Sequence, residues 1–138
     1  MVRDQRCHWP TENDMDEAIL RATENAEFPT EERCYITELS NSERDPHASI
    51  ARARVPVGIT TRWHRLHGIA ERYVILRGAG RVDVGMLGPQ RVGPGDVVLI
   101  PPSCRQRIAC LGDEALVFLA ICTPRFRQEA YEDVDDAA

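Results

Sequence analysis

The sequence predicts an all-β domain, and three observations support this prediction. Short apolar or alternating runs recur from residue 34 onward, separated by Gly, Pro, Asn and Asp. Helical signals are confined to residues 15–23, where Asp14 is a candidate N-cap and Ile19 and Leu20 belong to a weak apolar face. The length of 138 residues suits one domain with a single core. Many short strands with little helix indicate a barrel or a sandwich.

Composition divides the chain into three regions. Residues 1–33 form a polar N-terminal arm that includes the short predicted helix, residues 34–124 form the barrel, and residues 125–138 form an acidic C-terminal tail. Residues 48–127 carry twelve arginines against five acidic residues, whereas residues 128–138 carry five acidic and no basic residues. We expect the tail to be a solvated end. The alternative is that it folds over the basic barrel, its own or that of a partner.

Within the barrel region, the alternating runs predict eight strands, at residues 35–39, 49–55, 60–66, 72–77, 81–85, 96–100, 106–109 and 116–122. Glycines near residues 78–80 and 93–95 supply the turns. The segments 71–77 and 116–122 are apolar on both faces, beyond the first residue of the former. Because a single barrel buries only one face of each strand, we expect a second subunit to cover the other. A homodimer is therefore predicted.

Several classes of function are not expected. No apolar run approaches the ~18 residues of a membrane span, and residues 1–9 are too polar for a secretory signal, so we expect a cytoplasmic protein without a membrane partner. Without a basic helix or a run of exposed aromatics, nucleic acid is not an expected partner. The five cysteines are scattered and predict reduced core residues. All basic residues are arginine, which leaves a small anionic ligand open.

Two clusters of residues carry a recognisable pattern. The first contains Gly58, His64, Glu71 and Gly78, and the second contains Gly95-Asp96, Pro101 and Gln106. Over roughly residues 48–122, this pattern resembles the two motifs of the cupin superfamily. The resemblance implies a small double-stranded β-helix, or jelly-roll, barrel with a divalent metal near its centre. It does not specify the reaction, because this fold hosts many.

The spacing of the histidines departs from the cupin pattern. The paired histidines of the family stand two residues apart and share a strand face, whereas His64 and His67 stand three apart and point to opposite faces of a regular strand. If His64 takes the first ligand position, Leu66 occupies the second. If His67 takes the second position, Arg65 occupies the first. We prefer His64, because Leu66 is a natural inward-facing residue.

The resemblance implies a reduced ligand set of His64, Glu71 and Gln106. Gln106 stands where the family usually has a third histidine, and an amide oxygen is a weaker donor than imidazole. Such a set leaves positions open for substrate and suits Fe, Mn, Ni or Zn. Additional ligand or pocket candidates are His67, Tyr73, Cys104 and Arg62. In a metal-free alternative, Glu71 forms an ion pair with Arg62 or Arg105 across the barrel.

The sequence thus supports two functions. The first is a metal-dependent dioxygenase or isomerase acting on a small oxygenated or anionic substrate, with the metal polarising a substrate oxygen. In that enzyme Glu71 is the acid or base if it does not bind the metal. The second is a non-catalytic barrel that binds or senses a small molecule without metal.

Overall fold

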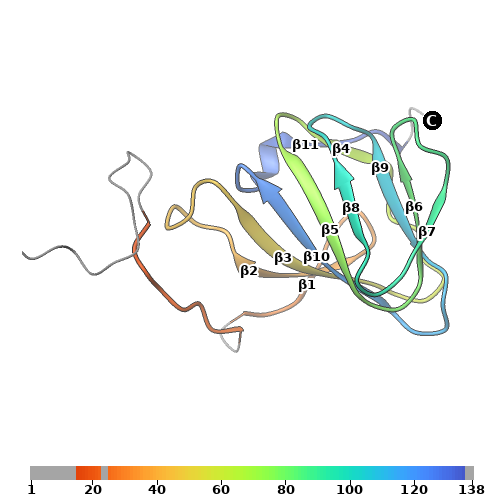
Figure 1. The fold of residues 1–138 in the computed structure, drawn as a ribbon, viewed down its shortest axis with the longest axis horizontal. Coiled ribbons are helices and arrows are strands. Elements are labelled where there is room, and N and C mark those ends of the chain that lie inside the picture. The colour runs from red at the N-terminus through yellow and green to blue at the C-terminus, as the bar shows by residue number, and fades with distance from the viewer. Residues whose placement is uncertain (1–14, 23–24, 136–138) are drawn as a thin grey trace, which may run out of the picture.

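Two antiparallel sheets face one another in the structure, a computed structural model that describes residues 15–22 and 25–135 (Figure 1). The six-stranded sheet has the order β1 (Phe28–Pro29), β2 (Tyr35–Ser40), β3 (Ser49–Val55), β10 (Leu116–Thr123), β5 (Ala70–Arg77) and β8 (Val97–Ile100). The five-stranded sheet has the order β11 (Tyr131–Asp133), β4 (His64–Leu66), β9 (Gln106–Cys110), β6 (Gly80–Val84) and β7 (Gln90–Val92). The predicted all-β class is confirmed.

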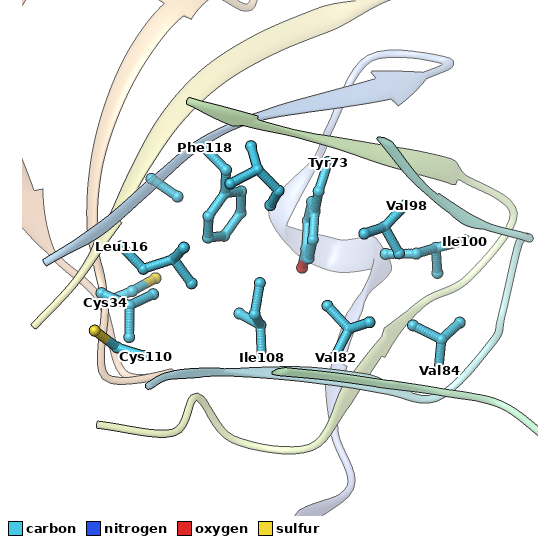
Figure 2. Packing of buried hydrophobic residues seen from close by; sticks show 13 residues of the cluster. Cys34, Tyr73, Val82, Val84, Val98, Ile100, Ile108, Cys110, Leu116 and Phe118 are labelled. Carbon is cyan, nitrogen blue, oxygen red and sulfur yellow. The ribbon is translucent and has the colours of Figure 1, made fainter. Parts of the chain in front are cut away.

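The hydrophobic core lies between the two sheets. Figure 2 shows Tyr73 and Phe118 of the six-stranded sheet facing Ile108 of the five-stranded sheet. The rings of Tyr73 and Phe118 are tilted by 43° with centroids 4.4 Å apart. Burial alternates along β5, so that Glu71, Tyr73 and Ile75 all point inward. The core therefore holds β5 rigidly and directs the Glu71 carboxyl into the interior.

The outer face of the six-stranded sheet is apolar near β5 and β8. Leu76, Val97 and Leu99 are 46%, 56% and 69% exposed, respectively. Exposed apolar side chains that cluster on one face are typical of a surface that meets another molecule. This face is the one that the sequence pattern assigns to a dimer contact.

The N-terminal helix predicted over residues 15–23 is wrong for the residues that the structure describes. Residues 15–21 have no regular secondary structure, and residue 23 lies outside the described residues. Ile19 and Leu20 are 73% and 46% exposed, so the described residues cover the weak apolar face only in part. Without tertiary packing, a segment of about nine residues is too short to be a stable helix. Among the described residues, no helix is long and apolar enough to cross a membrane.

The C-terminal segment is part of the barrel. Strand β11 pairs with β4 in a register that places Asp133 opposite His64, and the Val134 amide donates to the Trp63 carbonyl. Arg62 forms an ion pair with Asp133. The expectation of a solvated end is therefore wrong for residues 131–134, because the acidic side chains meet arginines of the chain's own sheet.

The strand positions differ from the predicted ones in two respects. The sequence does not predict strands β1 and β7, and β4 is shorter than the expected segment 60–66.

Candidate functional site

A cavity of about 450 Å³ lies against both sheets and is also lined by the segments before β2 and after β10. The residues that line it are Phe28, Pro29, Thr30, Glu31, Glu32, Ile36, Glu38, Asn41, Ser49, Ile50, Ala51, His64, Leu66, Glu71, Ala120, Cys122, Phe126, Gln128 and Tyr131. This volume is within the range of small-molecule sites. Two of the predicted site residues, His64 and Glu71, line it.

His64 is the first residue of β4 and is only 4% exposed. Its Nδ1 lies 2.9 Å from the carbonyl oxygen of Arg62, and only a protonated nitrogen can donate to a carbonyl. In the neutral ring, Nε2 is therefore the free base. It lies 3.5 Å from Oε2 of Glu32. The ring stacks on Tyr131 with centroids 5.3 Å apart. The carbonyl contact favours a proton on Nδ1, and the contacts with Glu32 and Tyr131 set the direction of the imidazole.

Glu71 presents a buried carboxyl group to the same cavity and is 8% exposed. Its Oε1 accepts a hydrogen bond of 2.8 Å from Nε2 of Gln106, and the Cys122 thiol lies 3.7 Å from its Oε2. Burial raises the pKa of Glu71, while the nearby His64 and the Gln106 amide act in the opposite direction. The net upward shift favours the protonated carboxyl, which is the form that can donate a proton.

Gln106 connects Glu71 to the core. The Tyr73 hydroxyl donates to Oε1 of Gln106 at 2.5 Å, and Nε2 of Gln106 donates to Glu71. Gln106 also lies opposite His64 in the β4–β9 pairing. Both ends of the amide are thus used within a buried network, and neither Tyr73 nor Gln106 lines the cavity. The network therefore orients the Glu71 carboxyl through residues that do not line the cavity.

The set of His64, Glu71 and Gln106 does not fit a metal ion in this arrangement. The amide oxygen of Gln106 accepts from Tyr73, and its NH₂ group, which cannot bind a cation, is the end directed at Glu71. Within residues 15–22 and 25–135, no group of three or more His, Cys, Asp or Glu side chains is placed to hold one metal ion. We therefore derive no step that passes through a metal.

The other predicted candidates lie away from the cavity lining. His67 is half exposed, and its Nε2 lies 2.7 Å from Oε1 of Glu132 on β11. Cys104 packs against the hydrophobic core, and Arg62 pairs with Asp133. His67 lies in the turn after β4, outside the strand that places His64 inward.

The ion pair considered for Glu71 is not what the structure contains. The guanidinium group of Arg105 lies 4.6 Å from the centre of the Trp63 ring. Arg62 lies against the acidic C-terminal segment. Glu71 bonds to Gln106 instead, so its carboxyl lacks the arginine that would hold it ionised.

The sequence-based reasoning missed two residues of this site, Glu32 and Tyr131. The Glu32 carboxylate accepts from the Cys34 thiol at 3.2 Å, and its backbone oxygen accepts from the Arg62 amide. The Tyr131 hydroxyl is buried and has no hydrogen-bond partner among the described residues. Glu32 gave no signal within a polar run. The apolar residues of the acidic tail, including Tyr131 and Val134, were the signal that this end is packed.

The family assignment follows from sequence as well as fold. The family named Cupin domain matches residues 51–122, which is more than half of the chain, so the protein belongs to the cupins. It is 31% identical to the uncharacterized protein MJ1618 of Methanocaldococcus jannaschii over 107 residues, covering 76% of this chain and 85% of that protein.

Solved structures share the architecture. Pac13 from Streptomyces, a nucleoside dehydratase, superposes with a TM-score of 0.72 at 17% identity, over 87% of this chain and 92% of that one. A predicted oxalate decarboxylase from Thermotoga maritima superposes with a TM-score of 0.67 at 22% identity, over 78% and 99% of the two chains. At these identities the likeness establishes the fold alone, and the predicted double-stranded β-helix is confirmed.

Proposed function

We propose that the protein catalyses a metal-independent proton transfer, of the lyase or isomerase class, on a small polar molecule in the cavity. The observation that carries this proposal is that a buried carboxyl group of the six-stranded sheet, Glu71, and an imidazole of the five-stranded sheet, His64, line the same cavity. Acid–base catalysis typically uses two titratable groups in different environments, so that one group donates a proton and the other accepts one.

Each group has one task in the proposed step. Nε2 of His64 accepts a proton from a substrate carbon, and the protonated Glu71 donates one to the oxygen that leaves or becomes a hydroxyl. In the lyase version, a C–H bond and a C–O bond break and water departs, so the electron pair of the C–H bond forms the new double bond. Gln106 is a positioning residue, since it holds Glu71 without lining the cavity. The dehydratase activity of Pac13 is consistent with such chemistry in a barrel of this shape.

The experiment is a search for solvent exchange. A panel of small hydroxylated carbonyl compounds and amines is incubated with chelator-treated protein in D₂O, and proton NMR follows the loss of individual C–H signals. We expect one class to exchange, with His64→Gln abolishing the exchange and His67→Gln, on the outer surface, leaving it intact. Exchange that persists in His64→Gln would contradict the proposal.

A metal-dependent dioxygenase or isomerase at His64, Glu71 and Gln106 is the second candidate. It is favoured by the family and by the presence of His64 and Glu71 on one cavity. It requires Gln106 to turn and give up two buried hydrogen bonds, each worth about 1 kcal/mol. Activity that is lost on chelation and restored by Fe, Mn, Ni or Zn would favour this candidate. A barrel that only binds its ligand would show neither exchange nor metal-dependent activity.

The proposal extends to assembly and location. We propose a homodimer formed through the outer face of the six-stranded sheet, supported by the exposure of Leu76, Val97 and Leu99. Light scattering should give the mass of a dimer, and Leu99→Arg should give a monomer. A monomeric wild-type protein at micromolar concentration would contradict this.

We also propose a cytoplasmic location, supported by four described cysteines that form no disulfide.

A further inference from the structure

The charges that face the cavity are of one sign. Four of its lining residues are glutamates, and no arginine is among them, although the chain contains seventeen arginines. The four are Glu31, Glu32, Glu38 and Glu71, of which the first three carry the charge, because the proposed function keeps the Glu71 carboxyl protonated. An anionic ligand, one of the classes considered from the sequence, would enter a field of like charge. The lining thus disfavours anions.

Two arginines of the barrel pair with other carboxylates. Arg65 pairs with Glu132 at 2.6 Å and Arg54 with Glu27 at 2.7 Å, both at the surface. Among the described residues, no ion pair forms at Glu31 or Glu38, whereas Glu32 lies 3.5 Å from Nε2 of His64. The Glu31 and Glu38 carboxylates thus have no cationic partner among those residues, which leaves their charge available to a ligand.

An uncharged feature of the cavity points to the same ligand. Three aromatic rings, those of Phe28, Phe126 and Tyr131, contribute to the lining, and aromatic faces attract organic cations. Carboxylates and aromatic rings together form a lining that suits a protonated amine.

We propose that the cavity binds a small organic cation carrying a protonated amine, held by Glu32 and Glu38 and by the aromatic rings of the lining. This rests on the proposed function in using the same cavity, and it names the substrate class. The buried Glu71 carboxyl is left for proton transfer. Glu32 and Glu38 both precede the family-matched segment 51–122, so membership of the family does not by itself imply this selectivity.

The test uses three probes of similar shape and different charge: benzylamine, benzyl alcohol and benzoate. Their affinities for the full chain are measured by calorimetry at low ionic strength. Benzylamine should bind about tenfold or more tightly than benzyl alcohol, and benzoate should bind weakest, since carboxylates attract the first and repel the last. Equal affinities, tighter binding of benzoate, or no binding of benzylamine would each overturn the proposal.

Variants assign the effect to the cavity. Glu38→Gln and Glu32→Gln should each weaken benzylamine binding about threefold to tenfold and leave benzyl alcohol unchanged. Glu43→Gln makes the same charge change at a residue that does not line the cavity and should have no effect. A thermal melt of each variant confirms folding. Loss of benzylamine binding in Glu43→Gln equal to that in Glu38→Gln would also overturn the proposal, because the effect would then follow net charge.

This test separates the two proposals. His64→Gln should keep the preference for benzylamine while losing proton exchange. If amines bind selectively but no compound exchanges, the proposed reaction fails and the ligand class stands. If exchange occurs on neutral compounds and benzylamine is not preferred, the reaction stands and the ligand class fails.

Discussion

The family-matched segment, residues 51–122, and the segments that flank it, residues 25–50 and 123–135, make different contributions to the molecule. The matched segment supplies most of the buried core and both His64 and Glu71. Thirteen of the nineteen residues that line the cavity come from the flanking segments, including Glu32, Glu38 and Tyr131. The proposed reacting groups therefore belong to the family-matched segment. Most of the residues that line the cavity, and that would select a ligand, belong to the flanking segments.

The largest effect should come from a matched pair of phenylalanine substitutions. Phe118→Ala removes a 3% exposed ring from the core and should lower the free energy of unfolding by about 3–5 kcal/mol. Phe28→Ala removes a 42% exposed ring from β1, so it should cost about 1 kcal/mol or less while weakening benzylamine binding. Urea unfolding measures the stabilities. Similar losses of stability in the two variants would contradict the claim that the family-matched segment, and not the flanking segments, forms the stabilising core.

Glu71→Gln should have the next largest effect, on catalysis rather than folding. It keeps the shape of the side chain but removes the proton that the acid donates, so exchange should fall by about 100-fold or more. Because the amide resembles the protonated carboxyl, the melting temperature should change little. Glu114→Gln, at a residue outside the cavity lining, is the control. Unchanged exchange in Glu71→Gln would remove Glu71 from the mechanism.

A smaller effect is expected where the C-terminal segment joins the sheet. The hydrogen bond from Arg62 lowers the pKa of Asp133 in the folded protein. A lowered pKa means that this contact stabilises the fold at neutral pH and is lost as the pH falls through the folded value of the pKa. Asp133→Asn should therefore lower the melting temperature at pH 7 and have little effect at pH 2. A constant difference between variant and wild type over this range would show that charge is not the cause.

Tyr131→Phe should have the smallest effect and should sharpen the role of the flanking segments. The substitution keeps the ring that stacks on His64 but removes the buried hydroxyl, which has no partner in the described residues. Stability should be unchanged or slightly higher, since an unsatisfied buried polar group is removed. Binding of benzylamine and of benzyl alcohol should change little, because the ring that lines the cavity is kept. Weakening of benzylamine binding alone would show that the hydroxyl contacts the ligand.

The fold was predictable because its signals are local. Alternation along the chain puts Glu71, Tyr73 and Ile75 on one face of a strand, and that face is the buried one. Those signals depend only on neighbouring residues. The strand positions follow from the same kind of pattern, apart from the shortest strands.

The cavity walls were not predictable in the same way, because they depend on pairing between distant parts of the chain. The Arg62 amide bonds to the carbonyl of Glu32, and Asp133 pairs with His64 in the ladder. No spacing rule relates such residues. The direction of the Gln106 amide likewise depends on the Tyr73 hydroxyl, which the strand pattern alone does not reveal.

Titration of the Glu71 carboxyl tests the central claim most directly. In chelator-treated protein, ¹³C NMR follows the carboxyl resonance with pH, and Glu71→Gln identifies it. Burial raises the pKa of Glu71, so the midpoint should lie above 4.5, the ordinary value. Because the folded pKa is raised, the contribution of this group to stability is complete below 4.5 and is lost as the pH rises through the folded value. A midpoint at or below 4.5 would contradict the account of Glu71 as the proton donor.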